Sequence, residues 1–168
     1  AVRGFINCVD GIVRAHHKTL RIWNDQIADY GIVKLRTDVV IDWWTSVSPV
    51  SNPQTTAPAT LLAKGYQVLN AGWYPNYYSP DLGPVAGSTP PQAAYTGWQV
   101  ADFYGQAFNN GRPLTRQHVP AGSPGLLGDT LAIWGPLPET TAQTARRVAP
   151  RLAVIAQKAW DSRQPFAS

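Results

Sequence analysis

Tryptophans end or closely follow four apolar segments of the sequence, and they are the residues best placed to do chemistry. They are Trp23, the pair Trp43 and Trp44, Trp73, and Trp134. An indole has two apolar faces and a polar N–H edge, so several indoles together suit the C–H faces and hydroxyl groups of a sugar. The alternative interpretation is that each tryptophan only packs a hydrophobic core. Their recurrence at the ends of segments favours an aromatic pocket.

The acidic residues, histidines and cysteine indicate what chemistry to exclude. Glu139 is the only glutamate, and no two acidic residues are adjacent. The single Cys8 excludes an internal disulfide and a cysteine-rich metal site. His16 and His17 are neighbours and His118 is isolated, so no zinc-ligand spacing such as HExxH occurs. We therefore expect neither a bound metal nor a cofactor.

Composition indicates one folded domain over residues 1–168. The hydrophobic fraction of 44% is that of a globular protein. The net charge of +4 is carried by scattered basic residues, and the nearest cluster, Arg146, Arg147 and Arg151, fits a charged helix face better than a nucleic-acid surface. No run of 18 apolar residues suggests a membrane span. We expect no nucleic-acid or membrane partner.

Hydrophobic periodicity predicts an alternation of helices and strands. Strands are expected at 19–23, 38–44, 67–70 and 130–134. Helices are expected at 5–16, 59–64, 97–108 and 140–148, followed by a further helical run through Trp160. Pro150 either kinks one long helix or begins a new one. The segment from Tyr74 to about Pro91 is expected to be a long functional loop.

This alternation predicts an α/β fold with a parallel sheet. Four βα units make about half of a (β/α)8 TIM barrel, whose active site lies at the carboxyl ends of its strands. A complete barrel typically needs about 250 residues, more than the 168 present here. The alternative is a small doubly wound sheet. No GxGxxG or Walker-type loop follows a predicted strand, which disfavours nucleotide binding.

Six short segments, taken in order along nearly the whole chain, carry a family resemblance. They are Leu-Arg-Ile-Trp-Asn-Asp at 20–25, the strand at 38–44, Lys-Gly-Tyr-Gln-Val-Leu-Asn at 64–70, Trp-Tyr-Pro-Asn at 73–76, Leu-Ala-Ile-Trp-Gly at 131–135, and Pro-Arg at 150–151 leading to Trp160. Together they resemble consecutive landmarks of family 20 glycoside hydrolases, the β-N-acetylhexosaminidases and lacto-N-biosidases. The resemblance implies that the chain supplies strands 5–8 of the family's barrel and its closing helix.

The same resemblance implies a substrate pocket for a terminal N-acetylhexosamine. Trp23, Trp44, Trp73 and Trp134 belong to its wall, with Trp43 as the alternative to Trp44. In the family, a tyrosine after strand seven binds the acetamido group, and an Asp or Asn two residues later holds a sugar hydroxyl. Tyr74 and Asn76 match these positions, while Tyr77 and Tyr78 are close enough to compete for the tyrosine's role.

Two departures from the family pattern concern catalysis. The family hydrolyses its substrate by substrate-assisted retaining chemistry, which needs an Asp-Glu pair at the end of strand four. The chain contains no such pair, and we expect it to lie upstream of Ala1. Glu139 follows Pro138 and is expected to begin a helix, where an acid suits the helix dipole. Pro136 replaces a glutamate that usually holds sugar hydroxyls two residues after the last tryptophan.

Two functions remain open on the sequence alone. The first is part of a family 20 hydrolase that is inactive without the N-terminal half of the barrel or some form of self-association. An isolated half-barrel exposes strand edges and apolar surface, which favours such association. The second is a non-catalytic carbohydrate-binding or structural domain with the same aromatic pocket.

Overall fold

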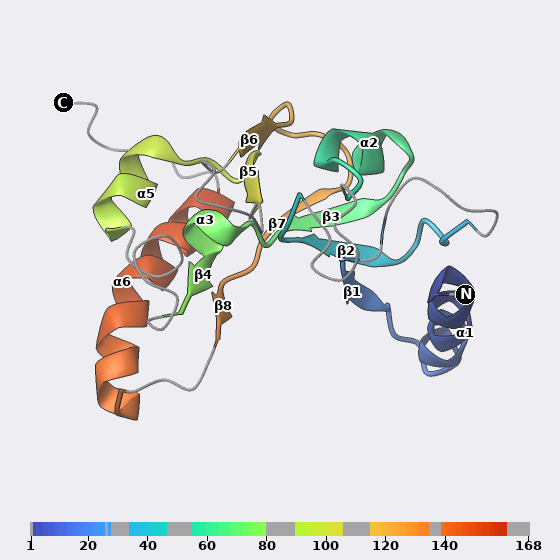
Figure 1. The fold of residues 1–168 in the computed structure, drawn as a ribbon, viewed down its shortest axis with the longest axis horizontal. Helices are drawn as coiled ribbons and strands as arrows, with labels where there is room; N and C mark the ends of the chain where they lie inside the picture. The colour runs from blue at the N-terminus through green and yellow to red at the C-terminus, as the bar shows by residue number, and fades with distance from the viewer. Residues whose placement is uncertain are drawn as a thin grey trace.

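A computed structural model of the chain describes residues 2–25, 27, 34–46, 55–79, 90–105, 115–134 and 139–160. Its main sheet has four parallel strands, which lie side by side in the order β1, β2, β3, β7 (Figure 1). Their bounds are β1 Arg21–Trp23, β2 Val40–Trp43, β3 Gln67–Asn70 and β7 Leu126–Asp129. Because neighbouring strands are parallel, all their carboxyl ends meet at one edge of the sheet.

Five helices and two small sheets surround the main sheet in the part of the chain that the structure describes. The helices are α1 Val2–Ala15, α2 Pro58–Ala63, α3 Trp73–Asn76, α5 Pro91–Gly97 and α6 Thr141–Ala159. The small sheets pair β4 Tyr77–Tyr78 with β8 Ala132–Ile133, in parallel, and β5 Asp102–Gly105 with β6 Thr115–His118, antiparallel. None of these helices is both long enough and apolar enough to cross a lipid bilayer.

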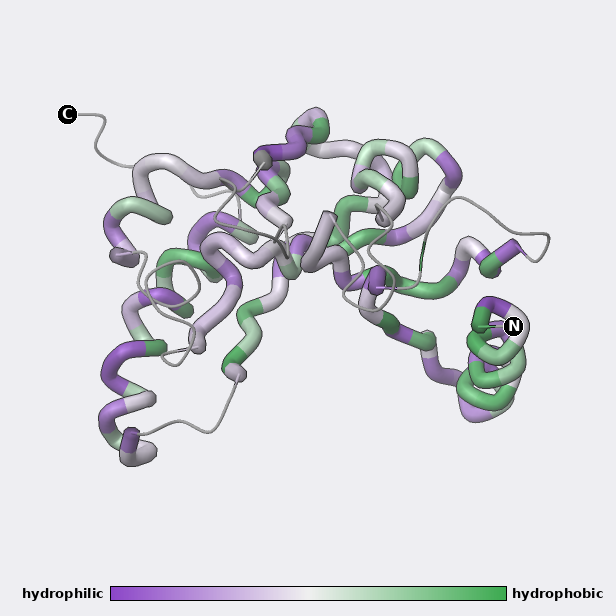
Figure 2. Tube along the Cα trace, viewed as in Figure 1, coloured by the Kyte–Doolittle hydropathy of each residue, from purple (hydrophilic) through white to green (hydrophobic). Residues whose placement is uncertain are grey.

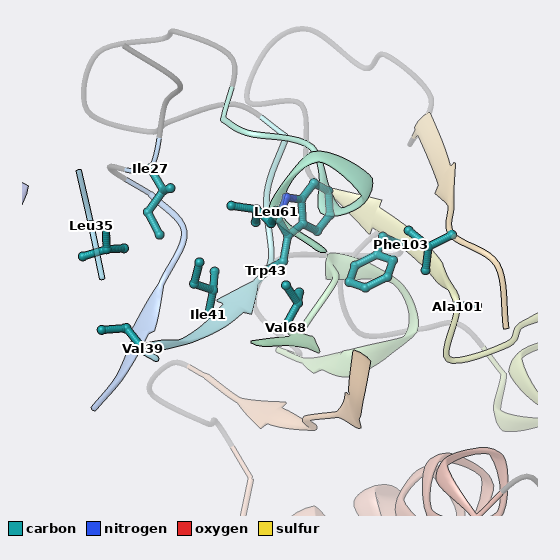
Figure 3. Close-up of a cluster of buried hydrophobic side chains, with 10 residues drawn as sticks. Ile27, Leu35, Val39, Ile41, Trp43, Leu61, Val68, Ala101 and Phe103 are labelled. Atoms are coloured by element: carbon teal, nitrogen blue, oxygen red, sulfur yellow. The ribbon is translucent and has the colours of Figure 1, made fainter. Parts of the chain in front are cut away.

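The main hydrophobic core lies on one face of the sheet. Ile41 and Trp43 of β2 and Val68 of β3 point to this face and pack with Leu61 of α2 and Phe103 of β5 (Figure 3). Successive side chains of a strand point to opposite faces. The intervening residues of β1 and β2 therefore lie on the other face, where a second set of contacts forms.

The antiparallel β5–β6 hairpin lies against the carboxyl end of β2. A side chain at Gly105 would place its Cβ 2.4 Å from the Ser46 backbone nitrogen and 2.7 Å from the Trp43 ring. Glycine is therefore required at this close approach of two backbones. The hairpin covers one side of the strand ends, next to the residues described below.

Three sequence expectations about elements were wrong. The helix predicted at 97–108 is instead α5, which ends at Gly97, followed by β5. The expected loop after Tyr74 contains α3 and β4 before the chain leaves the described residues. The fourth strand of the main sheet is β7 at 126–129, earlier than the predicted 130–134, and the later residues form β8 beside β4. β4 and β7 pair with strands distant in sequence, and β5 pairs with the next strand, β6; local periodicity shows none of these pairings.

The other predicted elements are confirmed to within a few residues, including the exact bounds of β3. Pro150 lies inside one continuous helix, α6, so it does not begin a new helix. Glu139 lies just before the N-cap residue Thr140 and bonds to Tyr78 and Arg147, contacts that the sequence did not predict. The predicted α/β fold with a parallel sheet is confirmed at the level of fold class.

Candidate functional site

Five aromatic side chains from four segments of the chain meet beyond the carboxyl ends of the parallel strands. This aromatic cluster consists of Trp23, Trp44, Trp73, Tyr77 and Trp134. The Tyr77 ring is its centre, with centroids 4.9 Å from Trp73, 6.0 Å from Trp44 and 6.0 Å from Trp134. It stacks on both Trp44 and Trp134, and Trp134 also lies 5.8 Å from Trp23.

The cluster has a buried side and an open side. Trp73 and Tyr77 are almost fully buried, whereas Trp23 and Trp44 are partly exposed and Trp134 is 44% exposed. A Trp ring left open to water at the edge of an aromatic cluster is available to stack on a ligand. The ring of Trp134 is therefore the most open stacking surface in the cluster.

Polar side chains that directly follow Trp23 hold Trp44 in place. The buried Asn24 side chain accepts a hydrogen bond from the Trp44 backbone N–H at 3.0 Å and donates one to the Thr45 carbonyl at 2.7 Å. The Asp25 carboxylate accepts one from the Trp44 indole at 2.9 Å. Sequence reasoning noted this Asn-Asp pair without giving it a role. Its signal was its position directly after a strand that ends in tryptophan.

An ion pair lies on the same face of the sheet, two residues before the tryptophans of the cluster in each strand, since Arg21 precedes Trp23 and Asp42 precedes Trp44. The Arg21 guanidinium donates to both Asp42 carboxylate oxygens, at 2.9 and 2.7 Å, and to the Thr130 hydroxyl at 2.6 Å. Asp42 is only 5% exposed. Burial raises the pKa of Asp42, and the Arg21 guanidinium opposes that rise. These three residues join β1, β2 and the end of β7 beneath the aromatic cluster.

Burial and two nearby carboxylates raise the pKa of the Tyr77 hydroxyl at the centre of the cluster. Burial raises the pKa of Tyr77, and the charges of Asp25 and Asp42 raise it further, while a hydrogen bond with the Trp134 side chain opposes the rise. The hydroxyl is therefore protonated at any physiological pH. A neutral phenol in this place donates or accepts a hydrogen bond.

Two predicted site residues lie outside the aromatic cluster. Tyr74 forms an edge-to-face pair with Tyr104 of β5 at 5.2 Å, and burial raises the pKa of its hydroxyl. Asn76 is fully buried, and its amide donates to the backbone carbonyl of Asn70 at 2.9 Å, while its Oδ1 has no partner. Of the three tyrosines that the sequence left open, the structure brings Tyr77 into the cluster.

Trp43, the last residue of β2, and Trp44, which follows it, have side chains on opposite faces of the sheet. Trp43 is fully buried in the main core, where it packs edge-on against Phe103 at 5.6 Å and its indole donates to the Thr56 carbonyl at 3.0 Å. Trp44 lies in the aromatic cluster. The structure therefore places Trp44, not Trp43, with the other predicted pocket residues. Pro136 lies outside the described residues.

The cluster offers stacking surfaces and hydrogen-bonding groups. Among the described residues, no group of three or more His, Cys, Asp and Glu side chains could hold a metal ion. The two carboxylates that act on Tyr77 both have partners, because Asp25 accepts from Trp44 and Asp42 is paired with Arg21. This arrangement is suited to holding a ligand with apolar faces and polar edges.

Comparison with known proteins identifies relatives of the whole chain. The sequence matches the family model for the catalytic domain of glycosyl hydrolase family 20 over residues 1–163. It is 28% identical over 170 residues to a lacto-N-biosidase from Bifidobacterium bifidum, covering 100% of this chain and 14% of that protein.

Solved structures show the same fold. Dispersin B superposes with a TM-score of 0.67 at 19% identity, over 91% of this chain and 46% of that one. One structure of the tandem family 20 catalytic modules of the pneumococcal exo-β-D-N-acetylglucosaminidase StrH superposes with a TM-score of 0.65 at 18% identity, over 95% of this chain and 37% of that one. The chain thus spans less than half the length of each of these three relatives.

Proposed function

Because the chain belongs to glycosyl hydrolase family 20, we propose that it forms the C-terminal part of that family's catalytic barrel and binds N-acetylhexosamine sugars. In this assignment β1, β2, β3 and β7 are strands 5–8 of a (β/α)8 barrel, and residues 1–168 act as one domain. The parallel order of these strands along the chain supports it, as does the share of the solved relatives' length that is covered. A 168-residue chain is also shorter than a typical complete barrel of about 250 residues.

The observation that carries the sugar site is the meeting of five aromatic rings at the carboxyl ends of parallel strands. Barrel enzymes hold their substrates at this end. The proposed walls are the rings of Trp23, Trp44, Trp73 and Trp134 together with the central ring of Tyr77. Tyr74 remains the proposed contact of the acetamido group, and Asn76 remains the proposed contact of a sugar hydroxyl.

The proposed reaction is the removal of a terminal N-acetylhexosamine by substrate-assisted retaining hydrolysis. The acetamido oxygen of the substrate would attack the anomeric carbon while the glycosidic C–O bond breaks and a glutamic acid protonates the leaving oxygen, and water would then open the cyclic intermediate. The 168 residues contain no Asp-Glu pair to orient the acetamido group and supply that proton. We therefore propose that this chain contributes binding and that catalysis requires an N-terminal family 20 segment. The name of the StrH relative, an exo-β-D-N-acetylglucosaminidase, supports N-acetylglucosamine as the first sugar to test.

A second candidate is a carbohydrate-binding domain without catalytic activity. Pro136 favours it, because this residue replaces an acid that would hold sugar hydroxyls. The two candidates share the aromatic cluster and differ only in turnover.

One set of assays tests both candidates. The purified chain is titrated with N-acetylglucosamine while its tryptophan fluorescence is followed, and it is incubated with a chromogenic N-acetylglucosaminide alone and with an N-terminal family 20 segment that carries the Asp-Glu pair. We expect binding by the chain alone and turnover only in the mixture. Binding without turnover in either case favours the non-catalytic candidate. Turnover by the chain alone would contradict the proposal that the chain lacks the catalytic acid.

A matched pair of tryptophan variants tests the site itself. Trp134→Ala removes the most open ring of the cluster, and Trp160→Ala removes a ring that is 85% exposed at the end of α6. We expect Trp134→Ala to weaken sugar binding by about tenfold or more and Trp160→Ala to leave it unchanged. Unchanged binding in Trp134→Ala would refute the placement of the site.

A further inference from the structure

Adjacent tyrosines of β4 connect the aromatic cluster to the C-terminal helix. Tyr77 and Tyr78 are both at least nine-tenths buried, and because they are neighbours in a strand their side chains point to opposite faces. Tyr77 packs in the aromatic cluster, whereas the hydroxyl of Tyr78 bonds to Glu139, just before α6. Figure 1 shows α6 running alongside β4 and α3. Tyr78 thus lies directly behind the proposed sugar site.

Charged groups from α6 and its N-terminal end surround Tyr78. Its hydroxyl donates to the Glu139 carboxylate at 2.8 Å, and that carboxylate accepts from Arg147 at 2.5 Å. The guanidinium carbon of Arg151 lies 6.0 Å from the Tyr78 ring centroid. Arg147 and Arg151 are four residues apart, so they extend from the same face of the helix. Burial and the Glu139 carboxylate raise the pKa of Tyr78, so its hydroxyl remains a donor throughout the neutral range.

Arg151 also holds the segment that leads into β4. It is only 4% exposed, and its guanidinium donates to the Pro75 carbonyl at 3.2 Å. Burying a charged group costs several kcal/mol unless hydrogen bonds and nearby charges offset it. The bond from the buried guanidinium to the Pro75 carbonyl connects α6 to the segment that leads into β4.

The backbone of Tyr78 extends this connection to Trp134. Its carbonyl accepts from the Trp134 N–H at 3.0 Å, and β4 pairs with β8 in the register Tyr77 with Ala132 and Tyr78 with Ile133. Two walls of the aromatic cluster, the Tyr77 ring and the Trp134 ring, are thus attached to one short strand. Whatever holds that strand sets the distance between them.

We propose that Tyr78, Glu139 and Arg151 form a clamp that positions the Tyr77 and Trp134 walls of the sugar site. The clamp residues are positioning residues, since the contacts described above are with the protein. This inference rests on the proposed sugar-binding function for its biological meaning. Its geometric consequence, a displaced Trp134 ring when the clamp is broken, is measurable without any sugar.

The test compares four variants with the unchanged chain. Arg151→Met removes the charge at similar length, Arg151→Lys retains a donor, and Tyr78→Phe removes only the hydroxyl. Arg146→Met is the matched control, because Arg146 is exposed on the same helix and its only described bond is to the Ala142 carbonyl within α6. Each variant is titrated with N-acetylglucosamine, and its unfolding temperature is measured in the same buffer.

Fluorine NMR of chains labelled with fluorotryptophan supplies the readout without ligand. The Trp134 resonance is assigned from its absence in Trp134→Phe. We expect it to shift in Arg151→Met and Tyr78→Phe, to shift less in Arg151→Lys, and to remain in place in Arg146→Met. Sugar affinity should fall by about tenfold in Arg151→Met, with partial recovery in Arg151→Lys.

The outcomes separate the clamp from the proposed function. A Trp134 resonance that is unmoved in Tyr78→Phe and Arg151→Met, with unchanged affinity, overturns the clamp. If the unchanged chain binds no sugar, the proposed function fails, and a moved resonance still supports the clamp. If Arg151→Met does not fold, Tyr78→Phe decides, since it keeps the ring and its packing.

Discussion

At the scale of the residue, Trp43 and Trp44 show how two adjacent identical side chains serve different ends. Trp43 fills the main core and donates to the buried Thr56 carbonyl. Trp44 is partly exposed and donates to the partly exposed Asp25 carboxylate. The two side chains are separated because successive residues of an extended chain point to opposite faces of the sheet.

This difference predicts unequal costs for the same substitution. Trp43→Phe leaves a gap in the core and a buried carbonyl without its donor, so we expect the free energy of unfolding to fall by about 2–4 kcal/mol. Trp44→Phe should cost about 1 kcal/mol or less, because water replaces the lost bond to Asp25. Urea unfolding followed by circular dichroism measures both values. Equal losses would contradict the assignment of Trp43 to the core.

Asp129, at the end of β7, predicts a dependence of stability on pH. Burial raises the pKa of its carboxyl from 3.8 to about 7, and one of its oxygens has no hydrogen-bond partner. The folded chain therefore keeps a proton that the unfolded chain releases, so this group's stabilisation is complete below about pH 4 and is lost as the pH rises to about 7.

Asp129→Asn should remove this dependence. We compare the free energy of unfolding of the variant with that of the unchanged chain at each pH. This difference should rise in favour of the variant by at most about 4 kcal/mol from pH 4 to pH 8, which corresponds to about three pKa units. Urea unfolding at the two pH values gives the difference, and the comparison cancels the contributions of other groups. Parallel curves for the two chains would show that Asp129 titrates normally.

The residues of the aromatic cluster were predictable in part from the sequence. The tryptophans Trp23, Trp44, Trp73 and Trp134 could be placed together because parallel strands bring their carboxyl ends to one edge. Tyr77 could not be chosen over Tyr74 from the sequence. Its position depends on the short helix α3, which precedes β4. In β4 the Tyr77 side chain points toward the cluster and the Tyr78 side chain points toward α6.

At the scale of the element, α6 matters because it carries Arg151 of the clamp and begins directly after Glu139 and its N-cap Thr140. Its N-terminus is closed by a capping box, in which the Thr140 hydroxyl accepts from the Gln143 backbone N–H at 3.3 Å and the Gln143 side chain accepts from the Thr140 N–H at 2.8 Å. These bonds satisfy two backbone donors that a helix start leaves unpaired. The cap therefore fixes the helix next to Glu139.

Thr140→Ala should lower the free energy of unfolding by about 1 kcal/mol, because it removes the hydroxyl acceptor. Thr140→Ser keeps that acceptor and should recover most of the loss. Chemical denaturation of the three chains measures the effect. A loss in Thr140→Ser equal to that in Thr140→Ala would show that the cap is not the cause.

Elements with a clear periodicity within one segment were predictable, whereas an irregular strand was not. α1 and β3 follow from periodicity within a single segment. β7 was missed because its sequence contains a glycine with a φ of 129° and its pairing with β3 is interrupted by a register shift. Glycine weakens the sequence pattern of a strand. A register shift depends on the partner strand, so it cannot be predicted from one segment alone.

At the scale of the whole molecule, the sheet has two outer strands among the described residues, β1 and β7. α1 lies at the end of the molecule away from α6, and its tube in Figure 2 alternates hydrophobic and hydrophilic residues. Ile6 packs against the main core and Asp10 is buried, so one side of the helix faces the body of the protein. Val2, Phe5 and Ile12 remain 47%, 70% and 65% exposed. Their spacing of three and seven residues places them on one other face of α1.

An exposed apolar helix face at one end of a four-stranded sheet predicts association of the isolated chain. We expect sedimentation velocity to show assembly that increases with concentration, since apolar surface of this kind favours contact with a second molecule. Phe5→Ser combined with Ile12→Ser should shift the chain toward monomer, whereas the same change at the exposed Leu152 of α6 should not. Cys8 is exposed, so the measurement uses Cys8→Ser as the background to exclude a disulfide-linked dimer. If an N-terminal family 20 segment completes the barrel, its addition should replace self-association with a one-to-one complex. If α1 and the strand edges are ordinary solvent-facing surface, the added segment will not form this complex.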